Sequence, residues 1–153
     1  MDYKSFLNII YIIIMLVVLG QIYGIYNAKK SDKGNLIAYF NPHSRFLIAF
    51  LAGMLVLLAA YTLTLKDYFG IVYLISGFGF AYIAYQKIYL HENGILYGSK
   101  FTKWEDIKKW SYNERTKNLQ LVTGSGKRQK RIIPVALDDK SQVMTIIKQK
   151  KKR

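Results

Sequence analysis

Residues 46–85 read FLIAFLAGMLVLLAAYTLTLKDYFGIVYLISGFGFAYIAY, two apolar runs that are separated only by Lys66 and Asp67. As a single helix the segment would be some 60 Å long at about 1.5 Å per residue, which is twice the hydrocarbon thickness of a bilayer. We therefore expect it to fold back at Lys66 and Asp67 as a helical hairpin. Its two arms, residues 46–65 and 68–85, are each about as long as the ~17–25 residues that a spanning helix needs.

A third apolar run precedes the hairpin. Residues 6–26 contain no charged side chain, so they predict a further membrane span. The run exceeds the 7–15 apolar residues usual in a signal peptide, and no small-x-small cleavage site follows it before Lys29 and Lys30. A retained helix is the better interpretation, and residues 1–85 are expected to form an all-α membrane domain with three spans.

The charge of the chain is concentrated after the last apolar run. The whole sequence of 153 residues is 52% hydrophobic with a net charge of +14, and residues 86–153 alone hold 17 basic and six acidic side chains. Such a division fits neither a typical soluble domain nor a disordered chain. The chain has no cysteine, which excludes disulfides, thiolate metal clusters and a thiol nucleophile.

The distribution of lysine and arginine predicts the orientation in the membrane. Residues 27–45 carry Lys29, Lys30, Lys33 and Arg45 against a single acidic residue, and the segment after residue 85 is strongly basic. Loops rich in these residues stay on the cytoplasmic side. We therefore expect a multi-pass plasma-membrane protein with its amino terminus outside and its carboxyl terminus in the cytoplasm.

Small residues recur at helical spacing in the first span. Gly20, Gly24 and Ala28 are four residues apart and would let another helix backbone approach closely. We interpret them as a packing seam, either between helices of one chain or between two copies in a homodimer. A weaker match lies in the second run and further glycines lie in the third: Ala49, Gly53, Gly70, Gly77 and Gly79.

The carboxyl-terminal segment changes to short alternating runs bounded by turn residues, a pattern typical of strands. Residues 88–92 and 95–99 flank Asn93 and Gly94, the strongest short hairpin signal. Residues 107–112, 118–123 and 128–135 predict three more strands, and Trp110 and Tyr112 would face the packed side of the sheet. Asp138 or Asp139 then begins a helix. The expectation is an α+β domain over residues 86–153, with a five-stranded antiparallel sheet closed by a helix.

This order of elements resembles the pleckstrin-homology-like (PH-like) domains of small bacterial membrane proteins, including the YcxB-like group. The residues that carry the resemblance are Glu92-Asn93-Gly94-Ile95, Trp104-Glu105-Asp106-Ile107, and Ile146, Ile147 and Lys148 of the closing helix. The resemblance covers roughly residues 87–150 and implies a shape rather than a task. A full domain of this type has seven strands and a helix, so the sheet is either incomplete or completed by a second copy.

Two basic clusters are the candidate binding residues. One surrounds the last predicted strand and the other ends the chain: Lys127, Arg128, Lys130 and Arg131, then Lys148, Lys150, Lys151, Lys152 and Arg153. Near an anionic leaflet each such residue contributes ~1 kcal/mol of binding free energy. The alternative is that these charges only enforce topology and solubility. The lack of a recognition helix or an RNA-binding strand signature argues against nucleic acid as the partner.

The sequence offers no catalytic constellation. Gly124-Ser125-Gly126-Lys127 lacks the spacing and the following helix of a phosphate-binding loop, so a hairpin turn is the better interpretation. His43 and His91 lack metal-ligand spacing to each other or to carboxylates. We expect a non-enzymatic protein without cofactor or metal that binds anionic lipid headgroups or a membrane protein partner. The alternative is a bacteriocin immunity or transporter accessory protein, to which the chain is similar in size and charge.

Overall fold

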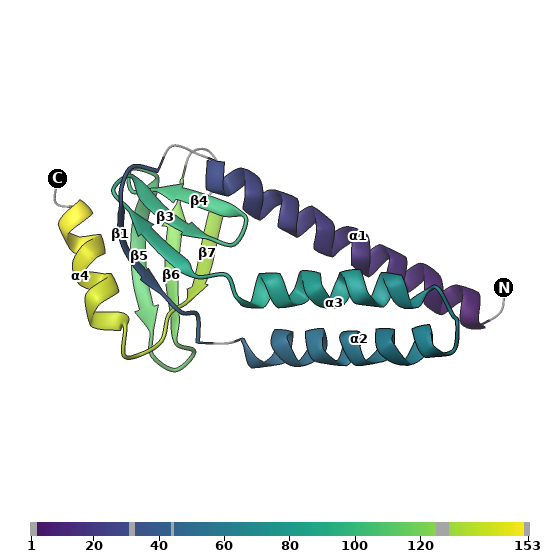
Figure 1. Cartoon of the computed structure of the whole chain (residues 1–153). Coiled ribbons are helices and arrows are strands. Elements are labelled where there is room, and N and C mark those ends of the chain that lie inside the picture. Colours follow the sequence, from purple (N-terminus) through teal and green to yellow (C-terminus); the bar gives the residue numbers. More distant parts are fainter. Residues whose placement is uncertain (1–2, 31–32, 44, 125–128, 152–153) are drawn as a thin grey trace. The chain divides into compact units, whose positions relative to one another are not determined.

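The computed structural model describes residues 3–30, 33–43, 45–124 and 129–151, and of residues 3 and 4 it describes the backbone alone. The chain divides into two compact units (Figure 1). The first unit comprises Met1–Tyr26 and Arg45–Tyr85, and the second comprises Asn27–Ser44 and Gln86–Arg153. Each unit is therefore built from two separate stretches of the sequence.

The first unit is helical. It contains most of α1 (Tyr3–Lys30) together with α2 (Phe46–Thr64) and α3 (Gly70–Ala84). Two of these helices, α1 from Ser5 onward and α2, are long and apolar enough to cross a membrane. The third, α3, has 15 residues and is therefore about 22 Å long, less than the ~30 Å of hydrocarbon. By length and composition, two of the three expected spans are supported.

The turn between α2 and α3 forms at the two charged residues, as predicted. Lys66 adopts a left-handed backbone with φ of 60°, which reverses the chain. The carboxylate of Asp67 then accepts a hydrogen bond of 3.0 Å from the N–H of Phe69. The backbone carbonyl of Asp67 accepts one of 3.1 Å from the N–H of Gly70. Asp67 thus satisfies two of the backbone donors that a helix start leaves without partners.

Close packing of α2 and α3 depends on glycines of α3. A β-carbon at Gly77 would lie 2.9 Å from Val56 Cγ2 and 3.2 Å from the carbonyl oxygen of Ala52. A β-carbon at Gly79 would collide with Val18 of α1. Because a β-carbon at either position would press against a neighbouring helix, the glycines of α3 allow the helices to approach closely.

The predicted seam in α1 does not pack within the described part of the chain at Gly20. A β-carbon there would have no atom within 4 Å, and Gly24 is partly exposed. Ala28 is buried, but it belongs to the portion of α1 that is grouped with the second unit. The role of Gly20, Gly24 and Ala28 in helix packing, within one chain or between two copies, stays a prediction.

The described residues of the second unit form seven strands in two antiparallel sheets, so the predicted single five-stranded sheet is not confirmed. One sheet has the order β1–β2–β3–β4, with bounds Leu36–Phe40, Ile88–His91, Gly94–Tyr97 and Lys100–Lys103. The other has the order β5–β6–β7, with bounds Ile107–Asn113, Asn118–Thr123 and Gln129–Pro134. The hairpin at Asn93 and Gly94 is confirmed, with Leu90 paired to Ile95.

The strand β1 comes from the connection that precedes the helical hairpin. It pairs with β2 across nearly fifty residues of sequence, with Tyr39 opposite Tyr89 and Phe40 opposite Ile88. The N–H of Asn35 donates a 3.1 Å hydrogen bond to the carboxylate of Glu92, and this bond lowers the pKa of Glu92. An isolated bridge from Pro42 to Val135 ties the end of β1 to the other sheet.

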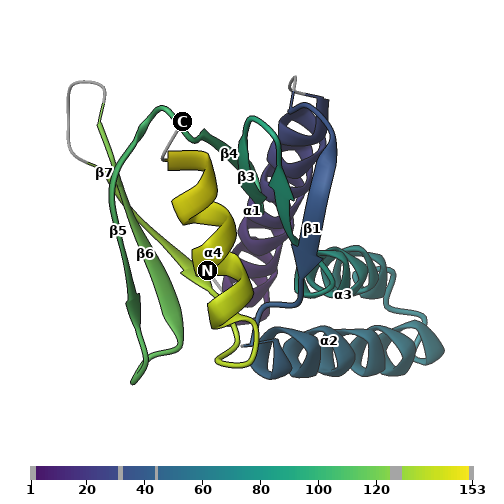
Figure 2. The same ribbon diagram turned by 90° about the vertical axis from the view of Figure 1, so that its left-hand side faces the viewer.

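A single hydrophobic core joins the two sheets to the closing helix α4 (Lys140–Lys151), which begins directly after Asp139 as predicted. Figure 2 shows α4 in front of the opening between the two sheets. Trp110 and Tyr112 pack partly buried against the core, which confirms the face predicted for them. The buried residues of the core are Phe40, Ile88, Leu90, Ile95, Trp104, Ile107, Leu119, Leu121, Ile133, Val135, Val143 and Ile147.

Candidate functional site

The exposed face of the three-stranded sheet carries Lys130, a member of the first candidate cluster. Residues directly opposite each other in antiparallel strands point to the same face. Lys109 is paired with Val122, and Val122 is paired with Lys130, so the two lysines share one row across the sheet. The neighbouring row on this face is Ser111, Gln120 and Ile132. We call these six residues the basic sheet face.

The basic sheet face combines positive charge with apolar surface. Lys109 and Lys130 are exposed, and their backbones are two strand spacings apart, roughly 10 Å across the strands. Ile132, at the end of its row on β7, is 52% exposed, and none of the six residues is acidic. The basic sheet face thus carries two ammonium groups on an exposed surface. Lys127 and Arg128, two further members of the predicted cluster, lie outside the described residues.

Arg131 was predicted to bind a ligand, but its side chain is used inside the fold. It follows Lys130 and therefore points to the opposite face of β7. Its guanidinium donates hydrogen bonds to the carbonyl oxygens of Tyr97 at 2.8 Å and Lys100 at 2.6 Å, and to the hydroxyl of Thr102. Burial lowers the pKa of Arg131 to about 10, which leaves it charged at neutral pH. Arg131 thus connects the two sheets.

The second predicted cluster lies at the end of α4. Lys148 is exposed, whereas Lys150 and Lys151 are half-buried. The ammonium of Lys151 donates a hydrogen bond of 3.1 Å to the carbonyl oxygen of Trp104, so it fastens the helix to the loop before β5. Lys152 and Arg153 lie outside the described residues. Among the described members of the two predicted clusters, Lys130 and Lys148 are the exposed cations, and they lie on different elements, β7 and α4.

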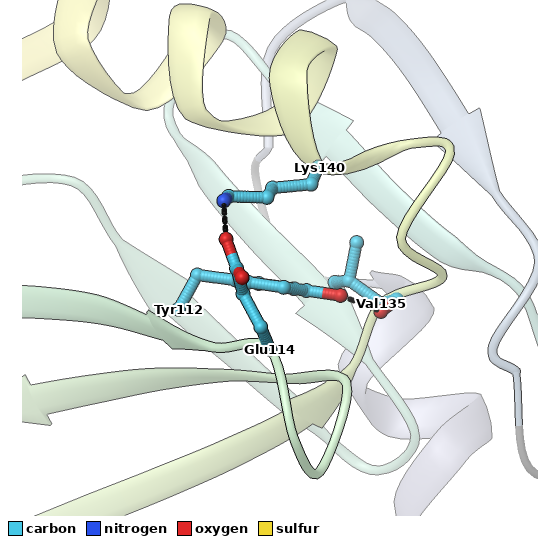
Figure 3. Close-up of polar contacts among 4 residues, drawn as sticks. All are labelled: Tyr112, Glu114, Val135 and Lys140. Atoms are coloured by element: carbon cyan, nitrogen blue, oxygen red, sulfur yellow. Dashed lines mark hydrogen bonds and ion pairs between the residues drawn. The ribbon is translucent and has the colours of Figure 1, made fainter.

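The start of α4 is attached to the three-stranded sheet by polar contacts (Figure 3). The hydroxyl of Tyr112 donates a hydrogen bond of 2.9 Å to the carbonyl oxygen of Val135. Lys140 forms an ion pair with Glu114, and its ammonium lies 5.4 Å from the centre of the Tyr112 ring. The ion pair lowers the pKa of Glu114, while burial raises the pKa of Tyr112 and keeps its hydroxyl a donor.

Replacing Tyr112 by phenylalanine is expected to lower the free energy of unfolding by about 1 kcal/mol, because one buried hydrogen bond is lost and the ring remains. The measurement is denaturant unfolding of the full chain in detergent, followed by tryptophan fluorescence. Ser111→Ala, next to it on the exposed face, should change the free energy by less than about 0.5 kcal/mol. Equal effects of the two variants would contradict the role of the hydroxyl.

The described residues show no arrangement suited to metal chemistry. Among residues 3–30, 33–43, 45–124 and 129–151, no three His, Asp or Glu side chains gather where they could hold an ion. His91 instead lies beside the rings of Tyr89 and Phe101, with centroid distances of 6.4 and 6.5 Å. Its Nδ1 is 3.3 Å from the carbonyl oxygen of Gly34. The ring belongs to a packed aromatic surface.

Comparison with known families finds DUF5673, a domain of unknown function, at residues 86–152. The match begins just before β2 and extends past the last described residue of α4, so it covers six strands of the second unit and leaves out β1. No curated protein matches the chain. No solved structure matches it either.

Proposed function

We propose that the chain is a multi-pass, non-enzymatic membrane protein that holds a PH-like unit at the cytoplasmic face, where it binds anionic lipid headgroups. Support for the PH-like assignment comes from the count and order of elements. Sheets of four and three strands and a closing helix give the seven strands and one helix of a full domain of this type. The strand β1 from the loop between α1 and α2 completes the set, so no second copy is needed.

The pairing of β1 with β2 supports a definite topology. Because Leu36–Phe40 and Ile88–His91 form one ladder, both segments must lie on the same side of the membrane. The hairpin of α2 and α3 therefore leaves and returns on that side, so α3 crosses if α2 does. The apolar run from residue 68 to 85 is longer than α3 itself, and local thinning of the bilayer accommodates a short span at modest cost.

The positive charges then select the side. Lys29, Lys30 and Lys33 flank β1, and the segment after residue 85 is basic, so the shared side is cytoplasmic. With α1 as the first span, the amino terminus is outside. This orientation holds the second unit next to the leaflet in which anionic lipids produce a negative surface potential.

The observation that carries the lipid proposal is the basic sheet face. Lys109 and Lys130 project from one rigid sheet without an acidic neighbour among the six residues, and Val122 lies between them. Headgroup phosphates are attracted by the ammonium groups, while Ile132 offers apolar surface to the glycerol region. Since the sheet fixes the backbone at both lysines, binding requires ordering of their side chains but not of the backbone.

The variant Lys109→Gln/Lys130→Gln tests this function in the full chain. Two lost charges at ~1 kcal/mol each predict a decrease of roughly 30-fold in affinity for anionic lipid. The measurement is native mass spectrometry of the detergent-solubilised protein mixed with phosphatidylglycerol and phosphatidylcholine, counting the bound molecules of each. The wild-type preference for phosphatidylglycerol should also weaken as salt is raised, because salt screens exposed charges.

The matched control is Arg115→Gln/Lys117→Gln, which removes two exposed charges from the turn between β5 and β6. It should retain the lipid preference. The proposal is overturned if both double variants lose the same amount of lipid, because net charge would then explain the binding. The proposal is also overturned if the wild-type protein shows no preference for phosphatidylglycerol, a result that would favour a protein partner.

A further inference from the structure

A groove lies between the two helices of the hairpin, wholly within the first unit. The helices α2 and α3 pack side by side (Figure 1). The groove between them has a volume of about 420 Å³, which is within the range of roughly 300–1,000 Å³ that is usual for ligand pockets. We call it the hairpin groove. Its lining includes Ala49, Ala52, Gly53 and Val56 of α2 and Phe78, Ala81 and Tyr85 of α3.

The hairpin groove has a floor of small residues and walls of large ones. Ala52 is buried, and a β-carbon at Gly53 would meet no atom within 4 Å. Leu57 and Phe78, which also line the groove, are 72% and 62% exposed, so they project beyond this floor. None of the lining residues is charged. An apolar hollow of this kind gains dispersion energy only when an apolar group fills it.

The hairpin groove suits a single hydrocarbon chain better than a further helix. Helices in contact have axes roughly 8–10 Å apart, whereas one helix with its side chains is about 10–12 Å wide. The β-carbon test at Gly77 shows that α2 and α3 are in such close contact. A third helix would therefore rest on Leu57 and Phe78 and leave the floor unfilled. A flexible acyl chain is narrow enough to contact Ala52 and Gly53.

One end of the hairpin groove lies next to a positive charge. The N–H of Ala49 donates a hydrogen bond of 2.9 Å to the carbonyl oxygen of Arg45, so Arg45 is one turn before Ala49. Arg45, Ala49, Ala52 and Val56 have the spacing i, i+4, i+7 and i+11, which puts them on one helix face. Since the 19 residues of α2 extend about 28 Å, Arg45 lies at headgroup level where α2 crosses the hydrocarbon.

We propose that the hairpin groove binds one acyl chain of a phospholipid whose phosphate pairs with Arg45. The inference rests on the membrane topology given under the proposed function, but it concerns a different site from the basic sheet face. The guanidinium complements the charge of the phosphate, and Tyr85 at the end of α3 suits the boundary between water and lipid. Because every phospholipid has a phosphate and acyl chains, the groove does not require an anionic lipid.

Photocrosslinking tests the proposal with phosphatidylcholine that carries a diazirine in one acyl chain. The full chain is placed in nanodiscs that contain this lipid, and peptide mass spectrometry locates the crosslinks after irradiation. Crosslinks to Phe78 and Ala81 are expected in the wild type. Gly53→Leu should reduce them several-fold, because the leucine side chain fills the hollow. Arg45→Gln should also reduce them several-fold, because the phosphate loses its partner.

Gly20→Leu is the matched control for Gly53→Leu. It makes the same change at an exposed position of α1 where a β-carbon would also meet no atom within 4 Å, and it should leave the crosslinks to Phe78 and Ala81 unchanged. The inference is overturned if Gly53→Leu and Gly20→Leu give equal yields, which would indicate only the general lipid surroundings of the helices. An unchanged yield in Arg45→Gln overturns it as well.

Cysteine crosslinking tests the alternative occupant, a second copy, because the full chain contains no native cysteine. A disulfide between two copies of Gly53→Cys in the nanodisc would overturn the inference, since protein would then cover the groove. The two lipid proposals fail separately. A normal preference for phosphatidylglycerol without specific crosslinks at the groove removes this inference alone, and the reverse result removes lipid binding at the basic sheet face alone.

Discussion

Replacing Gly94 by alanine is expected to lower the free energy of unfolding of the second unit by about 3 kcal/mol, near the upper end of overpacking effects. A β-carbon there would collide with the backbone carbonyl oxygen of Thr102 and lie 2.8 Å from Phe101 Cζ. The carbonyl cannot move away without disturbing the pairing of Gly94 with Lys103 and Ile95 with Thr102. The loss is measured by denaturant unfolding of the full chain, followed by fluorescence of Trp104 and Trp110.

Gly98→Ala is the matched control for Gly94→Ala. Gly98 has φ of 59° in the turn between β3 and β4, and a β-carbon there would meet no atom within 4 Å. Its replacement therefore costs only the left-handed backbone strain, about 1 kcal/mol. An effect of Gly94→Ala no larger than that of Gly98→Ala would show that the strands β3 and β4 are not held as described.

Replacing Arg131 by methionine is expected to cost about 3 kcal/mol, because hydrogen bonds to a charged donor contribute more than neutral ones and their loss leaves the acceptors without donors. The guanidinium donates hydrogen bonds to the carbonyl oxygens of Tyr97 and Lys100, which flank the turn between β3 and β4, and to the hydroxyl of Thr102. Arg131→Lys should recover only part of the loss, since one ammonium cannot reproduce the fork geometry of arginine. Unfolding of the full chain in detergent measures both variants.

Lys130→Met provides the control for Arg131→Met, because it removes the adjacent positive charge from the exposed face of the same strand. Its expected effect on stability is within about 0.5 kcal/mol. The two positions should also separate in the lipid measurement, where Lys130 matters directly. Similar stability losses at positions 130 and 131 would argue that Arg131 acts only through surface charge.

The sequence predicted those elements whose signals are local. Residues close together in the chain were enough to predict the apolar runs, the turn at Lys66 and Asp67, and the hairpin at Asn93 and Gly94. The structure contains the corresponding elements: α2, its turn with α3, and the pairing of β2 with β3. The strand β4, KFTK, was missed because it contains a single hydrophobic residue. The strand β1 was missed because its five apolar residues precede a membrane helix and their partner lies far along the chain.

The alternation of side chains along the last strand could have predicted that Arg131 points into the fold, whereas a count of charges could not. Ile133 is buried, and Arg131 is two residues before it, so both point to the same face of β7. Lys130 and Ile132 occupy the other face. Likewise Trp110 packs against the core, so Lys109, the residue before it, points to the exposed face. The position of Lys109 beside Lys130 could not be predicted, because it depends on the register of three strands.

The contribution of residues 36–40 to the sheet determines which fragments of this protein can be studied alone. A fragment that starts at residue 86 would lack Phe40 from the interior and would expose the unpaired backbone of β2, an edge that invites aggregation. The smallest soluble candidate is instead a fusion in which a short linker replaces the helical hairpin and joins residue 43 to residue 86. Boundaries placed at the start of the DUF5673 match would divide a folding unit.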